Sequence, residues 1–400
     1  MKVLVVNCGS SSIKYQLLEM PEAMVLAKGL LEKIGEKNSN LKQAYSGKEI
    51  EIKRDIANHD AGMRLILEVL TDKKTGVLKD IKEIKAVGHR VVHGGEYFKE
   101  SAIIDEKVIK IIEDYADLAP LHNPPNLIGI KAASSSLPHA PQIAAFDTAF
   151  HQTIPPTAFL YAIPYELYEK YRIRRYGFHG TSHRYVARRL AELENKGKYD
   201  LNIITCHLGN GCSITAIKKG KSIDTSMGLT PLEGVVMGTR SGDIDPAIIF
   251  YLAERRGMKI EEINKLLNKK SGLLGISGIS NDMREIREAH KKGDKKASLA
   301  LEIFCYRIKK YIGAYYASLG HVDAIVFTGG IGENAADIRW NILAGLEELG
   351  IIMDKARNEK AIRTEAIISG ANSRVKVWVI PTNEEARIAH DAYQLAKENQ

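Results

Sequence analysis

The chain has 400 residues, of which 44% are hydrophobic and 26% are charged, and it carries a formal net charge of +8. This length exceeds what one hydrophobic core usually supports, so we expect two domains, and the balanced composition excludes a disordered or low-complexity protein. No apolar run reaches the roughly 18 residues of a membrane span, and the lysines are spread over surface-like helical segments, so neither a membrane nor a nucleic acid is expected as a partner.

Two strand-turn-strand segments of similar make-up lie about 200 residues apart. In the first, apolar strands at 3–6 and 13–18 flank a turn at 7–12. In the second, strands at 202–206 and 214–217 flank a turn at 207–213. Turns rich in glycine and serine present backbone N–H groups to an anion. The repetition therefore predicts two similarly built halves, each offering one turn to a shared ligand.

The rest of the chain alternates apolar strands with amphipathic helices, which predicts an α/β architecture. Further strands are predicted at 86–92, 142–147 and 324–328, and helices at 106–118, 126–136, 182–194, 245–256, 297–319, 338–349 and 384–398. The proline-containing stretch 154–164 interrupts this periodicity and marks a boundary. We expect one domain from residues 1–150 with the C-terminal helix at 385–400, and a second domain from residues 151–384.

The first turn has the composition of a phosphate site, Asn7-x-Gly9-Ser10-Ser11-Ser12-x-Lys14. Small residues, hydroxyl groups and an ammonium group suit phosphate oxygens, although an ordinary hairpin with a surface lysine has the same pattern. The second turn lacks the Gly-Lys-Ser/Thr ending of a Walker loop, which excludes a P-loop NTPase. A third glycine cluster, at 329–334, follows a strand and would let a flat ligand approach the backbone. Taken by itself, this cluster is explained equally well as a structural turn.

These segments resemble the signature segments of the acetokinase family. The resemblance covers the whole chain without a departure at the matched positions, which are 4–14, 88–95, 145–151, 176–183, 203–214, 237–243 and 381–385. It implies the superfold of actin, Hsp70 and sugar kinases, with two duplicated ribonuclease-H-like domains, mixed sheets flanked by helices, and an interdomain ATP cleft. It also implies a reversible, Mg²⁺-dependent phosphoryl transfer from ATP to acetate, giving acetyl phosphate and ADP.

The chemistry of that reaction requires fixed cations, because an anionic acceptor meets an anionic donor. Arg90 and Arg240, each expected in a glycine-containing turn after an apolar strand or loop, satisfy this need. The resemblance makes His179 the group that stabilises the transition state and Asp147 a catalytic aspartate. Since acetate has no proton to remove at neutral pH, Asp147 is expected to position other groups. We expect direct in-line transfer; a phosphohistidine at His179 is the alternative.

The resemblance assigns the metal to Asn7 and Glu384, whose oxygen atoms suit Mg²⁺, with Mn²⁺ as a substitute. Glu384 has a simpler explanation as the first acidic residue of a helix. None of the histidines near these motifs has partners at zinc spacing, so supporting roles are expected for them. The four cysteines form no CxxC pair, which suits a reducing cytosol and a cytoplasmic protein.

The resemblance also assigns substrate contacts. Acetate is expected to bind Arg90, with its methyl group in a pocket of Val92, Leu121, Phe178 and Pro231. ATP is expected to contact Ser10, Ser12, Lys14, His207, Leu208, Gly209, Asn210, Gly211, Asp282, Met283, Arg284, Gly330, Ile331, Gly332, Glu333 and Asn334. A shallow apolar pocket discriminates one methylene by only ~1 to 3 kcal/mol, so a propionate kinase is the near alternative.

Two other classes share the superfold, since a fold does not determine a function. One is an ATPase that acts as a chaperone or filament-forming switch, which has no need of two arginines and a histidine. The other is a polyphosphate hydrolase, which would need a positioned water in place of an apolar pocket. The resemblance further implies a homodimer joined through the second domain.

Overall fold

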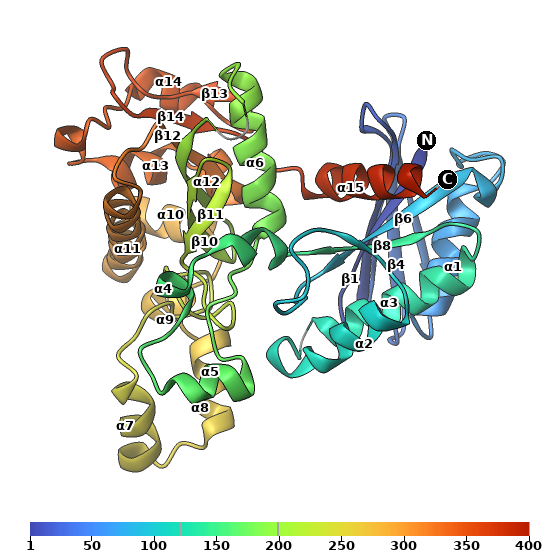
Figure 1. Cartoon of the computed structure of the whole chain (residues 1–400), viewed down its shortest axis with the longest axis horizontal. Helices are drawn as coiled ribbons and strands as arrows, with labels where there is room; N and C mark the ends of the chain where they lie inside the picture. The colour runs from blue at the N-terminus through green and yellow to red at the C-terminus, as the bar shows by residue number, and fades with distance from the viewer. Residues whose placement is uncertain (121, 198–199, 400) are drawn as a thin grey trace. The chain divides into compact units, whose positions relative to one another are not determined.

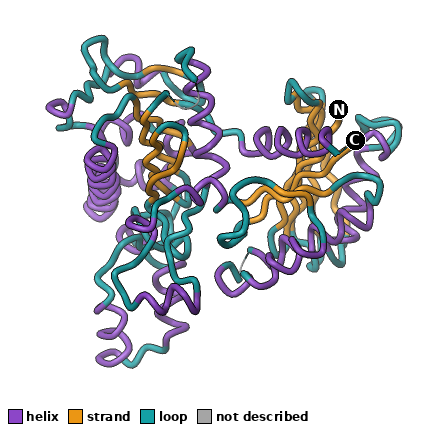
Figure 2. The backbone as a smooth tube through the Cα atoms, in the orientation of Figure 1, coloured by secondary structure: helices purple, strands orange, loops and turns teal. Residues whose placement is uncertain are grey.

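The computed structural model describes residues 1–120, 122–197 and 200–399. The chain forms two compact units, one built from Met1–Gln152 with Asn383–Gln400 and the other from Thr153–Thr382. Each contains a mixed sheet flanked by helices (Figures 1 and 2). The predicted α/β fold class is therefore confirmed. Among the described residues, no helix is long and apolar enough to cross a membrane.

The first unit is built on an eight-stranded sheet in the order β5-β4-β3-β2-β1-β6-β8-β7. Its strands are β1 (Lys2–Cys8), β2 (Ser12–Glu19), β3 (Met24–Glu32), β4 (Ser39–Tyr45), β5 (Lys48–Arg54), β6 (Ile84–Val91), β7 (Ala102–Ile103) and β8 (Gln142–Phe146). Its helices are α1 (His59–Leu70), α2 (Glu106–Asp114), α3 (Asn123–Ser136) and α15 (Glu384–Glu398). Alternation along β1 buries Val3 and Val5 beneath α15 and Leu4 and Val6 in the core shared with α1 and α3.

The second unit has a six-stranded sheet in the order β11-β10-β9-β12-β14-β13. Its strands are β9 (Asn202–Leu208), β10 (Cys212–Lys218), β11 (Lys221–Thr225), β12 (Ala324–Thr328), β13 (Ala366–Ile367) and β14 (Lys376–Val379). Its helices are α4 (Pro156–Phe159), α5 (Tyr165–Tyr171), α6 (Gly180–Leu193), α7 (Ala247–Arg256), α8 (Ile260–Lys269), α9 (Gly272–Ser277), α10 (Met283–Lys291), α11 (Lys295–Leu319), α12 (Gly329–Asn334), α13 (Ala336–Leu343) and α14 (Lys355–Lys360). Helices α6 and α11 pack on β9.

The two sheets repeat one arrangement. In the first, β1 runs antiparallel to β2 and parallel to β6. In the second, β9 runs antiparallel to β10 and parallel to β12. The burial pattern along β1 is also the same, residue by residue, as that along β9. The two polar turns predicted from the sequence thus occupy equivalent places, each joining the first two strands of its sheet.

Several predicted element boundaries were wrong. Arg90 lies within β6, inside the strand predicted at 86–92, and not in the glycine-containing turn that was also expected for it. The helix expected at 106–118 ends at Asp114 and is followed by a separate 3-10 turn at Ala116–Leu118. The helix expected at 338–349 begins at Ala336 and ends at Leu343, because Gly345 adopts a φ of 80° that stops it. The glycine cluster at 329–334 forms helix α12, whereas a turn was expected.

Candidate active site

In the first unit, three charged groups meet where β6, β8 and α15 come together. The guanidinium Nη2 of Arg90 donates to the Asp147 carboxylate, and its Nε lies 3.8 Å from the Glu384 carboxylate. Asp147 is only 1% exposed, while the side chains of Arg90 and Glu384 are each 21% exposed. Burial opposes the charge of Arg90, but the Asp147 and Glu384 carboxylates outweigh it and raise the pKa of Arg90. The geometry therefore holds a charged guanidinium at a partly open site.

The first polar turn lies beside this group. Lys14 pairs with Asn7 in the register of β1 and β2, and its ammonium group forms an ion pair with Glu385. The N–H of Gly9 donates to the Ser12 carbonyl at 2.9 Å and closes the turn. A Cβ at Gly9 would lie 2.9 Å from the Ser12 hydroxyl, so a larger residue there would force the Ser12 side chain to move. The expected proximity of Lys14 to the turn is thus present, with a carboxylate as its partner.

Glu384 has an unusual proton affinity. Its pKa is raised from 4.5 to about 7 as the net of several effects: burial is the largest and raises it, Arg90 and Lys14 lower it, and the carboxylates of Asp147 and Glu385 raise it. Asn383 caps α15 by accepting from the N–H of Ala386 at 3.0 Å, which fixes Glu384 as the first residue of the helix. An ionised Glu384 is therefore poorly compensated by the protein alone, and a cation would favour it.

Glu384→Gln is expected to raise the unfolding midpoint at pH 8 in the absence of divalent cations. Because the folded pKa of Glu384, about 7, lies above 4.5, folding takes up a proton between these values. The contribution of Glu384 to stability is therefore present at low pH and lost as the pH rises through 7. The variant should gain about 1 to 3 kcal/mol over the wild type at pH 8 and almost nothing at pH 4.

Thermal unfolding at both pH values measures this difference. Glu106→Gln is the matched control, because Glu106 is also the first residue of its helix but is exposed. It should show no such pH-dependent gain. An equal effect of Glu384→Gln at pH 4 and pH 8 would contradict the raised pKa.

In the second unit, His179 and Arg240 converge on the polar turn between β9 and β10. His179 has a left-handed backbone, with a φ of 55°, and α6 begins at the next residue. Its Nδ1 lies 2.9 Å from the Ser213 hydroxyl, and its ring stacks on His207 with centroids 4.3 Å apart. A Cβ at Gly211 would lie 3.4 Å from both the Nε2 of His179 and the Nη1 of Arg240. The two basic side chains are therefore close neighbours over this glycine.

Arg240 lacks a carboxylate partner among the described residues. The one polar contact of its side chain there is from Nη1 to the Met237 sulfur at 3.8 Å. Burial lowers the pKa of Arg240, and the small opposing effect comes from Cys212. Burying a charge without a partner is costly, so a retained guanidinium of this kind indicates an anionic ligand.

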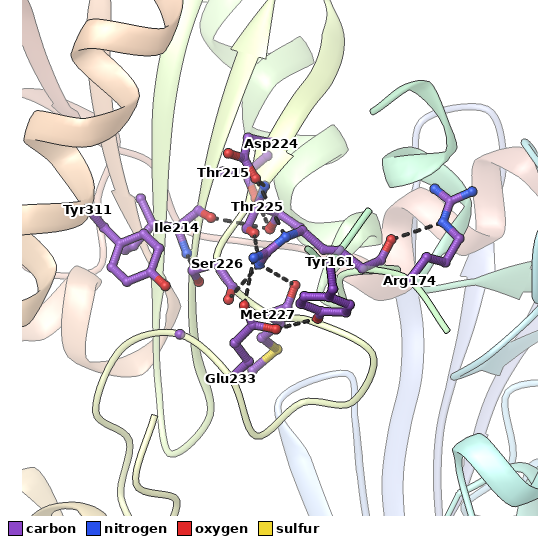
Figure 3. Close-up of polar contacts among 12 residues, drawn as sticks. Tyr161, Arg174, Ile214, Thr215, Asp224, Thr225, Ser226, Met227, Glu233 and Tyr311 are labelled. Carbon is purple, nitrogen blue, oxygen red and sulfur yellow. Dashed lines mark hydrogen bonds and ion pairs between the residues drawn. The ribbon is translucent and has the colours of Figure 1, made fainter. Parts of the chain in front are cut away.

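Arg175 stabilises the loop that leads to Arg240. Arg175 Nη1 donates to the Thr225 and Ser226 carbonyls at 2.7 and 3.1 Å, and Nη2 donates to Glu233 at 2.6 Å. The Tyr161 hydroxyl donates to the same Glu233 carboxylate. Figure 3 shows these loop residues gathered at one place. The partly buried ion pair thus holds the backbone between β11 and Arg240, a segment that includes the predicted pocket residue Pro231.

A cavity of about 760 Å³ opens beside the second polar turn, within the same unit. Its volume lies in the range of small-molecule sites. Asn281 Nδ2 donates to Asn210 Oδ1 at 3.0 Å and links two of its walls. Eight lining residues were predicted as ATP contacts, namely Gly209, Asn210, Asp282, Met283, Arg284, Gly330, Ile331 and Asn334. The cavity therefore brings the second and third glycine clusters together around one space.

The remaining predicted residues occupy different surroundings. The Glu333 carboxylate accepts from the N–H groups of Gly329 and Thr382 at 2.9 and 3.1 Å, so it braces the backbone. Val92 and Phe178 are buried, each within its own unit, while Leu121 lies outside the described residues. Sequence reasoning missed some lining residues, which are Glu285, Arg287, Ala335 and Arg363. Each stands outside a glycine-rich motif, so no composition signal marks it.

The second unit of this α/β protein has a guanidinium without a carboxylate partner among the described residues, beside a polar turn and a nucleotide-sized cavity. These are the features of a phosphotransferase. Comparison with known proteins agrees: the model of the acetokinase family matches residues 2–390. The chain belongs to the acetokinase family.

Individual relatives are similar over their full length. The acetate kinase of Caldanaerobacter subterraneus subsp. tengcongensis is 60% identical over 399 residues, which cover 99% of each chain. The crystal structure of Porphyromonas gingivalis acetate kinase matches with a TM-score of 0.95 and 49% identity, covering 98% of this chain and 99% of that chain. A propionate kinase from Francisella tularensis subsp. tularensis SCHU S4 matches with a TM-score of 0.92 and 46% identity, covering 98% and 99%.

Proposed function

We propose that this chain catalyses reversible phosphoryl transfer between ATP and acetate, giving ADP and acetyl phosphate. The observation that carries the proposal is the Arg240 guanidinium, which has no carboxylate partner among the described residues and lies beside His179 over Gly211. A transferring phosphoryl group would supply the missing anion. The identity of the relatives, 60% for one named acetate kinase, supports acetate as the acceptor.

Each group of residues takes a share of the reaction. A carboxylate oxygen of acetate attacks the γ-phosphorus of ATP, the bond from that phosphorus to the β,γ-bridging oxygen breaks, and ADP leaves with the electron pair. Arg240 and the Nε2 of His179 stabilise the charge on the phosphoryl oxygens, and Arg90 binds the acetate carboxylate. Asp147 orients Arg90 through their ion pair. No proton needs to be removed from the acceptor, so no general base is required.

Magnesium is part of the proposal. The amide oxygen of Asn7 and the carboxylate of Glu384 are the oxygen ligands that Mg²⁺ prefers, with water and phosphate oxygens completing the shell. The raised pKa of Glu384, about 7, supports this assignment, because the ionised form gains from a nearby cation. When bound, the ion neutralises phosphate charge. Mn²⁺ should substitute.

ADP formation from ATP, measured with and without acetate, tests the proposed function. We expect formation of ADP to depend on acetate and to be very slow without it. A superfold ATPase or a polyphosphate hydrolase would release ADP or phosphate at a rate that acetate does not change. That outcome would reject the proposal.

Val92→Ala is expected to shift the preference from acetate toward propionate. Val92 follows Arg90 by two residues and is the first residue after β6, which ends at Val91. If the alternation of the strand continues for that one residue, both side chains lie on one side of the sheet. Removing two methyl groups makes room for one methylene and should change the ratio of specificity constants by ~1 to 3 kcal/mol. Steady-state kinetics with both acids measures the ratio.

Val91→Ala is the control for this prediction. Val91 is the neighbouring buried valine, but it packs on the opposite side with Ile130 and Phe146. It should reduce stability without changing the ratio. If Val92→Ala impairs acetate use and leaves propionate use unchanged, Val92 is a core residue and the methyl pocket lies elsewhere.

Several features of the assembly belong to the same proposal. We assign residues 1–150 with 385–400 to one ribonuclease-H-like domain and residues 151–384 to a second that binds nucleotide and forms a homodimer in the cytoplasm. Helix α7 supports self-association, because Phe250 and Tyr251 are 62% and 54% exposed and none of its residues is buried. Sedimentation velocity should give a dimer, and a monomer at micromolar concentration would reject this part.

A further inference from the structure

A line of buried polar side chains runs behind His179 inside the second unit. The Ser213 hydroxyl lies between two imidazole rings, 2.9 Å from Nδ1 of His179 and 2.7 Å from Nε2 of His183. On the far side of His183, its Nδ1 lies 2.7 Å from the Thr205 hydroxyl. Thr205, His183 and Ser213 are completely buried. Four side chains are therefore joined by three hydrogen bonds, from the interior of the sheet to His179.

The local structure explains this alignment. Along β9, Thr205 alternates with the apolar residues Ile204 and Cys206, so its side chain projects from the opposite face of the sheet. Along β10, Ser213 is likewise flanked by apolar residues, and α6 packs on β9 and carries His183 in its first turn. His183 is four residues from His179, one helical turn along the same side of the segment. The sequence pattern thus places the three supporting groups in one row.

The row has a direction because a hydroxyl group carries only one hydrogen. Within the described part of the chain, the Thr205 hydroxyl bonds to Nδ1 of His183 and to nothing else. If Thr205 only accepted there, its own hydrogen would be buried without an acceptor, at a cost of about 1 to 3 kcal/mol. Thr205 therefore donates, and Nδ1 of His183 accepts.

The remaining protons follow from this first assignment. A neutral imidazole that accepts at Nδ1 carries its proton at Nε2, so His183 donates to the Ser213 hydroxyl. Ser213 then uses its single hydrogen to donate to Nδ1 of His179. We infer that Thr205, His183 and Ser213 form a directional relay that holds His179 as the neutral tautomer with its proton on Nε2.

The tautomer decides what His179 can do. With a proton on Nε2, beside Gly211 and Arg240, the ring can donate to a phosphoryl oxygen. It has no lone pair there to attack phosphorus, and Nδ1 is held by Ser213. The relay thus favours direct transfer over a phosphohistidine. Only this consequence rests on the proposed function; the tautomer itself does not. Thr205, His183 and Ser213 are positioning residues, because they act through His179.

NMR spectroscopy of the full chain labelled with ¹⁵N-histidine tests the tautomer without ATP or acetate. The His179 signals are assigned by their absence from the His179→Gln variant. At pH 7.5 we expect an unprotonated Nδ1 and a protonated Nε2 for His179. A protonated Nδ1, with or without a proton on Nε2, would overturn the inference whatever substrate the enzyme uses. Because the measurement needs no turnover, its failure is distinguishable from failure of the acetate assay.

Three threonine variants test the relay itself. Thr205→Val removes the hydroxyl with little change of shape, and Thr205→Ser keeps it. Thr215→Val makes the same change on the paired residue of β10, whose hydroxyl bonds to Thr225 at 2.8 Å instead (Figure 3). Thr205→Val should give a mixture of His179 tautomers and lower kcat about 10-fold with little change in the KM for ATP.

Thr205→Ser should restore both readouts, and Thr215→Val should change neither by more than about twofold. If Thr205→Val and Thr215→Val give the same His179 spectrum and the same kcat, the relay is rejected. Ser213→Ala, which cuts the row next to His179, provides a second test should Thr205→Val fail to fold. It should likewise mix the tautomers, and an unchanged His179 spectrum in this variant would also reject the relay.

Discussion

Arg240→Ala is expected to lower kcat/KM by about 100-fold to 1,000-fold while leaving the unfolding midpoint unchanged or higher. The loss of rate follows from removing a cation that stabilises the transferring phosphoryl group. The unchanged stability follows from the surroundings of Arg240, which include no carboxylate among the described residues, and from the burial that lowers the pKa of its guanidinium. Removing an uncompensated, partly buried charge relieves a cost of folding.

Initial rates with ATP and acetate, together with thermal unfolding, measure both effects. Arg188→Ala is the control, because Arg188 is 49% exposed and paired with Glu192 on the surface of α6. Such an exposed ion pair contributes little to stability, so the unfolding midpoint should hardly change. Activity should stay within about threefold of the wild type. Activity of Arg240→Ala within threefold of the wild type would reject its role, and a large fall in its unfolding midpoint would show that Arg240 is structural.

Arg90→Ala is expected to reduce activity by a similar factor and, in contrast, to destabilise the fold by about 3 kcal/mol. Asp147 is only 1% exposed and forms an ion pair with Arg90. Removing the guanidinium takes that ion pair away from a buried carboxylate. The two arginines therefore have similar expected effects on rate but different effects on stability.

A double substitution separates the two effects of Arg90. Arg90→Ala combined with Asp147→Asn removes both charges, so it should recover most of the lost stability and none of the activity. Denaturant unfolding and initial rates of the two single variants and the double variant give the coupling between the residues. If Arg90→Ala is as stable as Arg240→Ala, the ion pair with Asp147 contributes no more to the free energy of unfolding than a surface ion pair does.

The polar turns and their sheets were predictable because their signals are local. A β-branched run, a turn of glycine and serine, and a second alternating strand specify a hairpin within about 15 residues. The repeat of this pattern at 202–217 identified the duplication, and the structure gives both hairpins the same place in their sheets. The buried run of each first strand was visible in the sequence, but the predicted turns began too early, because Asn7 and Cys8 belong to β1 and His207 and Leu208 belong to β9.

The relay behind His179 and the ion pair of Arg90 were not predictable in the same way. Thr205, His183 and Ser213 come from three elements, and only the register of β9 with β10 and the packing of α6 bring them together. Threonine on a strand and histidine in a helix are common, so neither gives a signal alone. Arg90 was expected in a glycine-containing turn, although the predicted strand at 86–92 included it; the apolar alternation continues through Val91 and keeps Arg90 in β6.

The product formed from the acceptor tests the proposed reaction most directly. The purified chain is incubated with ATP, Mg²⁺ and acetate, and the acyl phosphate is trapped with hydroxylamine as a hydroxamate, which is compared in amount with the ADP released. We expect one acetohydroxamate for each ADP, and about 100-fold to 1,000-fold slower formation of both products by Arg240→Ala. Release of ADP with inorganic phosphate and no hydroxamate would show that water is the acceptor and would contradict the assignment of a carboxylate kinase.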